Sequence, residues 1–506
     1  MVARLRILLP LLIAMCAAHA SEPSNQLATR RSSVVFVSED LRGYLAPCGC
    51  SEAMRGGIDR AVEQIAEARA ANPSVLFVDG GDALFGKTAL APAEVPQEEL
   101  KAKTIARAFK VAKLATRAIG PLDNARGAAF RKSLELPEQE HGTVRLFEQS
   151  GMKLAIAAAA SEEELIATAR RARHSGAQFV LGLFYQTLER AQQAASNPAL
   201  QASLLFATRA ADELDGEANR LVRTRVPVAR VQSKGRSLAR VDISYAQREA
   251  PFELQKTPDD VERELASLDQ RIELLRKELN APGLGKEIKA LKQGKLDELV
   301  KRREAIASAP LPEAAGNVFA VRFIPLEPSL PSMPEVKALI DRYDRDVGLL
   351  NLAWARKHGK DCPRAAADQA AYVGNEACRA CHEDAFPVWE GSKHARAYQT
   401  LVDVGRQYDL SCVGCHVIGY DKPGGVCRVD KVEGRKGVGC ESCHGPGSIH
   451  SDGPGEPNIL AKPDKADCIR CHNPENSSHF EFSTYLPQIL GPGHGGQTSG
   501  AKTGSR

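Results

Sequence analysis

The chain of 506 residues has few long apolar runs, little net charge and, in its last third, no methionine. After residue 20 no stretch stays apolar for the ~20 residues that a membrane-spanning helix needs, so we expect no transmembrane span in the mature protein. A net charge of +4 is small for this length and gives no reason to expect nucleic acid as a partner. The composition, 43% hydrophobic and 26% charged, is that of a globular protein with two or three domains.

The first twenty residues have the pattern of a secretory signal peptide. Two arginines precede the apolar run 7–14, and 18–20 (AHA) is a small-x-small cleavage sequence. We therefore predict a signal peptide over 1–20, a mature start at Ser21 and a periplasmic or otherwise exported protein. An uncleaved anchor helix is the alternative. Cys16 suggests a lipoprotein, but the methionine before it is bulky where such sequences carry a small residue, so we expect no lipid anchor.

Strand and helix patterns alternate after a polar linker at 21–32. Buried strands that end in turn residues are predicted at 33–38, 74–79, 154–160, 178–184 and 237–245. Helical periodicity predicts helices at 58–71 and 162–174. This alternation predicts an α/β domain over 33–253.

Residues 254–310 carry the pattern of a helical hairpin. The sequence 257–260 (TPDD) is a capping box with proline at the first helical position. Apolar residues then recur at alternating four- and three-residue steps, which is the coiled-coil period, until Pro and Gly at 282–285 break the pattern. We expect an inserted spacer or docking surface.

The chain then returns to the α/β domain over 311–356. A strand is predicted at 317–325 and is followed by a helix with one apolar face. Residues 357–371 are predicted as a linker. Beyond them Gly, Pro, His and Cys become frequent, and the tail at 495–506 is predicted to be disordered.

Four Cys-x-x-Cys-His motifs follow one another in the last third of the chain. They are Cys378/Cys381/His382, Cys412/Cys415/His416, Cys440/Cys443/His444 and Cys468/Cys471/His472. Thiols at this spacing form thioether bonds to haem vinyl groups, and the adjacent histidine becomes the proximal iron ligand. We therefore predict four covalently bound haem c groups over 372–494. Zinc knuckles are the alternative, but a zinc site does not need a histidine after every second cysteine.

The sixth iron ligands are predicted by elimination. No methionine follows Met333, so histidine–methionine ligation is not available in this region. The candidate distal ligands are the four remaining histidines of the region, His394, His450, His479 and His494. His358 is a reserve candidate, and one iron with an open sixth position is an alternative. Four haems in ~120 residues leave little apolar chain, so the haems are expected to form much of the core and the apo form is expected not to fold.

Several stretches of this region resemble the cytochrome c-554/c-prime multihaem family. They are 372–374 (YVG), 389–395 (WEGSKHA), 437–450 (GVGCESCHGPGSIH), 474–477 (PENS) and 479–480 (HF), together with the first and last motifs. The resemblance covers about 372–494. It implies a small, mostly α, loop-rich fold with closely stacked haems, His394 as a distal ligand and electron transfer as the activity.

The α/β region resembles calcineurin-like metallophosphoesterases of the 5′-nucleotidase type. The similar stretches are 38–43 (SEDLRG), 56–60 (GGIDR), 78–86 (VDGGDALFG) and 235–241 (GRSLARV). The resemblance implies a sandwich fold whose two-metal site begins with an Asp-x-His sequence and takes further ligands from Gly-Asp, Gly-Asn-His and two later histidines.

This chain departs from that pattern at the ligand positions. Arg42 stands at the first histidine, 118–123 (AIGPLD) lacks Asn and His, and Tyr185 follows the strand where a histidine is expected. A two-metal phosphoesterase needs imidazole and carboxylate ligands for both cations. We therefore predict a domain without hydrolase activity in which Asp40, Asp79 and Asp82 are remnants or ordinary turn and capping acids.

Two thiols, Cys48 and Cys50, lie one residue apart just after the first strand. Free thiols of an exported protein oxidise or bind a ligand, so the pair is a candidate redox dithiol or soft-ligand site; a structural role is the alternative. The pair resembles the Cys-Gly-Cys of exported cytochromes with nucleotidase-like domains, some of which are associated with selenite or tellurite reduction. A disulfide between the unassigned Cys362 and Cys427 is possible and not derivable from the sequence.

The favoured hypothesis is an exported tetrahaem c-type cytochrome that exchanges electrons with redox partner proteins and is fused to an α/β domain without hydrolase activity. One alternative is a terminal reductase of a small oxyanion that uses an open haem or the Cys48/Cys50 pair. A second alternative is a metal-dependent phosphoesterase or nucleotidase with atypical ligands.

Overall fold

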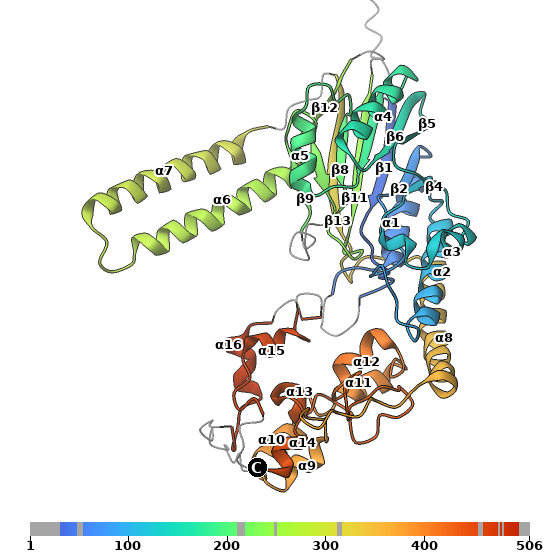
Figure 1. Ribbon diagram of the computed structural model, residues 1–506. Helices are drawn as coiled ribbons and strands as arrows, with labels where there is room; N and C mark the ends of the chain where they lie inside the picture. The colour runs from blue at the N-terminus through green and yellow to red at the C-terminus, as the bar shows by residue number, and fades with distance from the viewer. Residues whose placement is uncertain are drawn as a thin grey trace, which may run out of the picture.

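The computed structural model describes residues 31–47, 54–209, 218–246, 250–310, 316–453, 459–473, 476–477 and 480–494. An α/β sandwich lies above a smaller helical region, and a helical hairpin projects sideways from the sandwich (Figure 1). The predicted signal peptide and tail, Cys48, Cys50 and His479 lie outside the described residues. Among the residues that are described, no helix is long and apolar enough to cross a membrane.

Seven strands form the first sheet, in the order β12-β13-β11-β1-β2-β3-β4. They are β1 (Arg31–Ser38), β2 (Val75–Asp79), β3 (Thr116–Ala118), β4 (Glu138–Gln139), β11 (Ser237–Tyr245), β12 (Phe252–Leu254) and β13 (Asn317–Pro325). Strands β1 to β4 are parallel, whereas β11 is antiparallel to both β1 and β13. All four strands predicted in this part of the chain are confirmed.

Six strands form the second sheet, in the order β5-β6-β7-β8-β10-β9. They are β5 (Thr143–Gln149), β6 (Met152–Ala159), β7 (Phe179–Phe184), β8 (Leu204–Ala207), β9 (Arg220–Val222) and β10 (Val228–Arg230). The predicted strands at 154–160 and 178–184 are confirmed. The strands that sequence patterns did not predict are mostly two to four residues long, too short to show an alternation of apolar and polar residues.

The two sheets pack face to face, and helices cover both outer faces. Alternate residues of β1 point to opposite sides, so Val35 and Val37 enter the core between the sheets while Val34 and Phe36 enter the core under the helices. The helices on the first sheet are α1 (Ile58–Ala71), α2 (Val95–Val111) and α8 (Pro334–His358), and those on the second are α4 (Glu162–His174) and α5 (Leu188–Ser196). A short helix, α3 (Gly127–Ser133), follows β3. This arrangement confirms the predicted α/β sandwich.

The inserted hairpin consists of α6 (Pro258–Leu279) and α7 (Lys286–Ser308). The predicted capping box is present, because the Thr257 hydroxyl accepts from the Asp260 amide and the Asp260 carboxylate accepts from the Thr257 amide. The helices hold each other through a small cluster around Leu268, Ile272 and Leu299. The predicted hairpin is therefore confirmed, and it extends well beyond the sandwich (Figure 1).

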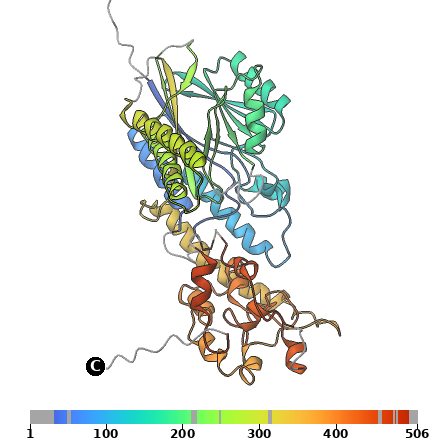
Figure 2. The ribbon, with the colours of Figure 1, turned by 90° about the vertical axis from the view of Figure 1, so that its left-hand side faces the viewer.

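The C-terminal region is built from short helices and loops below the sandwich (Figure 2). Its helices are α9 (Asn375–Arg379), α10 (Ala385–Glu390), α11 (Ala397–Asp403), α12 (Leu410–His416), α13 (Cys440–His444), α14 (Ser448–Asp452), α15 (Lys465–Ile469) and α16 (Phe482–Tyr485). None of these helices exceeds seven residues. The predicted small, mostly α, loop-rich region is confirmed.

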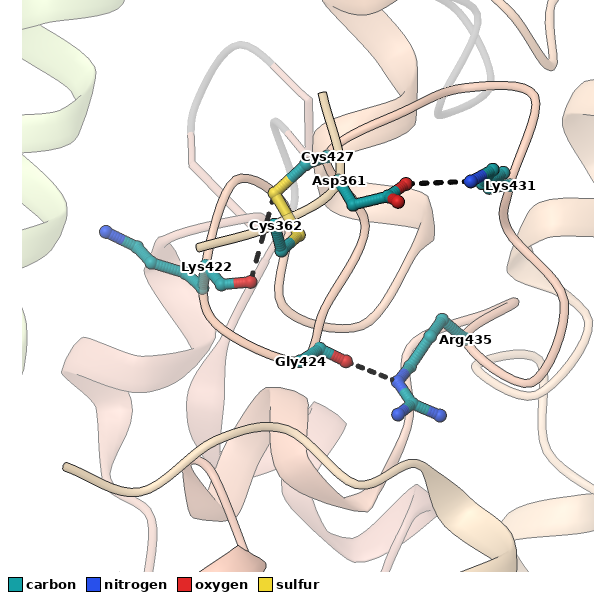
Figure 3. Close-up of a disulfide and its surroundings, with 7 residues drawn as sticks. All are labelled: Asp361, Cys362, Lys422, Gly424, Cys427, Lys431 and Arg435. Carbon is teal, nitrogen blue, oxygen red and sulfur yellow. Dashed lines mark hydrogen bonds and ion pairs between the residues drawn. A yellow bond between two sulfur atoms is a disulfide. The ribbon is translucent and has the colours of Figure 1, made fainter. Parts of the chain in front are cut away.

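The segment predicted as a linker is fastened to the C-terminal region. Helix α8 continues to His358, and a disulfide then joins Cys362 to Cys427, whose Cα atoms lie 5.1 Å apart (Figure 3). Beside it, Lys431 forms an ion pair with Asp361 at 2.8 Å (Figure 3). The disulfide that the sequence left open is therefore present and holds this segment against the loops of the C-terminal region.

Candidate functional site

Each Cys-x-x-Cys-His motif lies on or directly after a short helix. Helices α12 and α13 contain whole motifs, whereas α9 and α15 contain the first cysteine of theirs. A helical turn continues through the last motif, where the His472 amide donates to the Cys468 carbonyl at 2.8 Å. The same contact joins His382 to Cys378 at 3.0 Å. Such a turn places the histidine beside the thiols of its own motif.

The four motifs meet in two pairs. The Cys378 thiol of the first motif is hydrogen-bonded to the Cys440 thiol of the third; this contact raises the pKa of Cys378 and lowers the pKa of Cys440. The Cys415 thiol of the second motif is likewise bonded to Cys471 of the fourth, which lowers the pKa of Cys415 to about 7. These thiols stand in for the thioether sulfurs of a haem-bound protein, which do not titrate. Motifs that are distant in the sequence are thus neighbours in space.

Cys381 differs from the other predicted attachment cysteines in its surroundings. It is exposed to solvent, whereas the seven other motif cysteines are partly buried. This exposure does not bear on the predicted thioether bond, because a covalently attached haem would itself cover the sulfur. Its assignment as a haem-attachment thiol rests on the spacing of the first motif and stays a prediction.

Three of the proximal histidines face three of the candidate distal histidines. The ring centroids are 6.3 Å apart for His382 and His450, and 6.0 Å apart for His394 and His472. The third pair is His444 and His494, at 6.4 Å. Each pair joins a histidine of a motif to one outside it.

These separations fit an iron atom between the rings. Two metal–nitrogen bonds of about 2 Å, plus about 1 Å from each nitrogen to its ring centre, add up to about 6 Å. Two of the proximal histidine rings also form a hydrogen bond through one ring nitrogen. The Nδ1 atoms of His416 and His444 lie 2.6 Å and 2.7 Å from the carbonyl oxygens of Ala397 and Leu460. A carbonyl only accepts, so Nδ1 donates and Nε2 is left to bind a metal, the usual arrangement of a ligating histidine.

The second motif differs from the other three. Within the described residues, no histidine ring lies opposite His416. The reserve candidate His358 stacks on Trp354 instead, with ring centroids 5.6 Å apart. Because His479 lies outside the described residues, its prediction as a distal ligand stays untested.

A second cluster of functional side chains lies in the α/β domain and is dominated by arginines. The Arg117 guanidinium lies 2.5 Å from Asp123, 3.7 Å from Asp79 and 3.7 Å from Glu138, and its side chain is fully buried with those of both aspartates. Asp123 also accepts four backbone N–H groups, from residues 82, 83, 84 and 120. Arg117 thus supplies the positive charge that these buried carboxylates need.

The two other predicted acids have protein partners as well. Asp40 accepts from the Arg42 guanidinium at 2.7 Å and lies 3.9 Å from that of Arg230. Asp82 accepts from the Tyr185 hydroxyl at 2.7 Å. Burial raises the pKa of Asp82 to about 6 and that of Asp79 to about 7. The structure therefore brings the three acids together at the carboxyl ends of β1 and β2, but it gives each of them a donor from the protein.

Several residues of this cluster were not identified from the sequence. Arg117 and Arg230 lie in strands of three residues, and no local pattern marks them as buried. His141 stacks on Tyr185 with ring centroids 5.7 Å apart, although the segment around it matches no motif. Asp123 could have been identified from the sequence, because it lies in the 118–123 segment that stands where the phosphoesterase family has metal ligands. In the part of the chain that the structure describes, no group of three or more His, Cys, Asp or Glu side chains could hold a metal ion.

Comparison with known proteins identifies the C-terminal region. Residues 377–445 match the family model of cytochrome c554 and c-prime. The chain is 35% identical over 96 residues to cytochrome c-554 of Nitrosomonas europaea, a match that covers 16% of this chain and 41% of the relative. The chain therefore spans about two fifths of that relative's length.

Two of the solved structures similar to this chain are a 5′-nucleotidase precursor and a calcineurin-like phosphoesterase. A 5′-nucleotidase precursor from Thermus thermophilus has a TM-score of 0.40 and 10% identity over 81% of this chain and 72% of its own. A calcineurin-like phosphoesterase from Bacillus subtilis has a TM-score of 0.35 and 12% identity over 44% of this chain and 87% of its own. Since TM-scores this low say nothing about activity, the function of the α/β domain has to be inferred from its own side chains.

Proposed function

Because the C-terminal region contains a domain of the cytochrome c554 and c-prime family, we propose that this protein is an exported tetrahaem electron carrier whose α/β domain has no hydrolase activity. The observation that carries the proposal is the set of three facing histidine pairs beside four Cys-x-x-Cys-His motifs. A c-type cytochrome needs both features, covalent attachment and axial ligation.

The chain supplies the complete set of ligands for at least three haems. The eight motif cysteines provide the thioether sulfurs, and His382, His416, His444 and His472 provide the proximal nitrogens. His450, His494 and His394 are assigned as distal ligands opposite His382, His444 and His472, respectively. Bound haem iron supplies reversible one-electron transfer, and the paired motifs hold neighbouring haem sites.

The arrangement of charges supports the absence of hydrolysis in the α/β domain. A two-metal hydrolase uses its carboxylates to hold cations and activate water. Here Arg117 and Arg42 occupy carboxylate oxygens of Asp123 and Asp40, and a guanidinium neither binds nor acidifies a water molecule as a metal does. The acids are therefore assigned a structural role in the folded domain.

Export rests on the leader pattern of residues 1–20 and on the disulfide between Cys362 and Cys427. Structural disulfides persist in oxidising compartments outside the cytoplasm, which is also where haem is attached to c-type cytochromes.

A single preparation of the protein, matured with its haem groups, tests both parts of the proposal: the haem content and the absence of hydrolase activity. Intact-mass measurement should give the chain from Ser21 plus four haems, and three or fewer haems under full maturation would refute the tetrahaem assignment. Nucleotide and phosphomonoester substrates with added Mn²⁺, Zn²⁺ or Ca²⁺ should not be turned over. Turnover that disappears in Asp79→Ala would show that the α/β domain is an active hydrolase.

One observation favours a second function, reduction of a small oxyanion at the second haem. Among the described residues His416 has no histidine ring opposite it, and His479 lies outside them, so this iron is the candidate for an open sixth position. The oxidised protein should then show one high-spin haem that binds cyanide, beside three low-spin haems that do not. Four low-spin haems that all resist cyanide would exclude the reductase.

A further inference from the structure

The α/β domain and the cytochrome domain meet at a buried polar junction. Three side chains form it: Gln97 on α2, Asn351 on α8 and Asp409 at the start of α12, with exposures of 1%, 3% and 5%. Gln97 and Asn351 come from the α/β side, whereas Asp409 belongs to the cytochrome domain. Buried amides and carboxylates are costly unless they are hydrogen-bonded, so the contacts at this junction have to be specific.

Gln97 is bonded at both ends of its amide. Its Nε2 donates to the Asp409 carboxylate and to the Ser411 hydroxyl, both at 2.8 Å. Its Oε1 accepts from the Leu410 amide at 3.1 Å and from the Asn351 amide at 2.5 Å. Asn351 also donates to the Tyr408 carbonyl at 2.8 Å. The two α/β residues thus form hydrogen bonds with every residue of the segment 408–411.

That segment begins the helix with the second haem motif. The Asp409 carboxylate caps α12 by accepting from the Ser411 amide at 2.9 Å, and the Cys412 amide donates to the Asp409 carbonyl at 3.0 Å. Helix α12 contains Cys412, Cys415 and His416. The bonds from the α/β domain therefore end one to four residues before the first haem cysteine of this motif.

Further contacts extend the junction along α8. Asp344 forms an ion pair with Arg406 at 2.7 Å. Helix α8 is shared between the two cores, since Tyr343 and Val347 belong to the α/β cluster while Ala355 belongs to the cluster of the cytochrome domain. The Tyr343 hydroxyl is buried beside this junction and has no hydrogen-bond partner among the described residues.

The third motif is held differently, by its own domain. The Cys440 amide at the start of α13 donates to Asn375 at 3.0 Å, and Glu441 accepts from the amides of Val373 and Gly374. All of these residues lie in the C-terminal region. In contrast to the third motif, the second motif has the start of its helix fixed from across the domain boundary.

We propose that the α/β domain sets the midpoint potential of the second haem, with Gln97 and Asn351 as positioning residues that hold α12 and its capping carboxylate. The inference rests on the proposed cytochrome function. A buried carboxylate near a haem favours the more positively charged ferric state, and electrostatic effects are strong where water is excluded. Fixing Asp409 therefore fixes the potential of the haem beside it.

Gln97→Glu tests this in the full-length, matured protein. The substitution places a second carboxyl group against Asp409, and this buried pair shares a proton until the pH is high enough to remove it. Once both groups are ionised, the ferric form of one haem should be at least tenfold more stable, a shift of about −59 mV in one of the four titration components at high pH. The double variant Gln97→Glu/Asp409→Asn again has one carboxylate and one amide at the junction. The midpoint potential of that component should therefore return most of the way to its value in the unsubstituted protein. Gln64→Glu adds the same charge at a partly exposed position of α1 and should shift no component.

Gln97→Met guards against failure of the charged variant to fold. It keeps the length of the side chain but loses all four hydrogen bonds, and it too should shift one component only. Unchanged components in both Gln97 variants would overturn the inference, as would an equal shift of all four. Haem mass and reversible reduction of the unsubstituted protein are measured first, so failure of the cytochrome assignment would appear there and not in the variants.

Discussion

The two regions of this molecule are stabilised in opposite ways. The α/β domain has apolar clusters on both faces of both sheets, and its buried Asp40, Asp79 and Asp123 are paired with arginines. The described part of the cytochrome region has one small cluster around Val413, Val417 and Val426, and three pairs of its histidine rings lie about 6 Å apart. The polar site of the first region is made of acids paired with donors from the protein, whereas the second region brings pairs of histidine rings together.

This difference implies that only one region depends on haem for its fold. Fully buried aliphatic and aromatic side chains each contribute about 1.5–3 kcal/mol, and the α/β domain has dozens of them. The cytochrome region has few, so haem contacts have to replace the missing apolar burial.

The largest effect is expected from removing a haem attachment site. Cys440→Ser/Cys443→Ser should cost one haem and make the cytochrome region sensitive to protease, while residues 31–356 stay resistant, because the α/β core needs no cofactor. Limited proteolysis with mass analysis of the fragments measures this.

Cys362→Ser/Cys427→Ser is the matched control, since it also removes two cysteines of the exported chain. It should keep four haems and lose about 2 kcal/mol or less, because the haem bonds already cross-link the region. Equal protease resistance in both double variants would show that the cytochrome region folds without its full set of haems.

The next largest effect concerns the arginine that pairs with the buried acids. Arg117→Met leaves Asp79 and Asp123 without their buried cation and should reduce the free energy of unfolding of the α/β domain by about 3–5 kcal/mol. Arg126→Met, which breaks the partly exposed pair with Glu99, should cost about 0–1 kcal/mol. Chemical denaturation followed by α/β circular dichroism compares the two. Similar losses would mean that Arg117 does not compensate the buried charge.

Features of the fold and the site could be predicted from the sequence where they depend on neighbouring residues, and could not where they depend on contacts between residues far apart in the chain. The hairpin, the four motifs and all long strands except β5 (Thr143–Gln149) are local patterns that were predicted. The partners of His382, His394 and His444 lie far along the chain, so elimination gave the set of histidines but not the pairing. Arg117 in β3 and Gln97 in α2 have local sequences typical of surface residues, and only tertiary packing buries them. The disulfide between Cys362 and Cys427 is also a long-range contact. The sequence left two cysteines unassigned but gave no information on how close they lie in space.

The smallest effect concerns pH. Burial raises the pKa of Glu39 from its ordinary 4.5 to about 8, and its Oε1 accepts from the Val231 amide at 2.7 Å. A raised carboxyl pKa stabilises the fold fully below about pH 4.5, and this contribution is lost as the pH rises through about 8. Glu39→Gln keeps the acceptor but cannot ionise.

The variant should therefore gain about 1 kcal/mol or more relative to wild type between about pH 5 and about pH 9. Thermal unfolding at both pH values measures the difference, and the exposed Glu67→Gln serves as control. A pH-independent difference would mean that Glu39 does not titrate in this range.

The most direct test of a haem-based electron carrier on an inactive α/β domain is a coulometric titration of the matured protein followed by its visible spectrum. We predict four electrons per chain, taken up and released reversibly, each accompanied by the absorbance change of one haem. Fewer than four electrons, or further electrons that reduce the protein without a change in haem absorbance, would contradict the proposal; further electrons would point to a second redox centre in the chain.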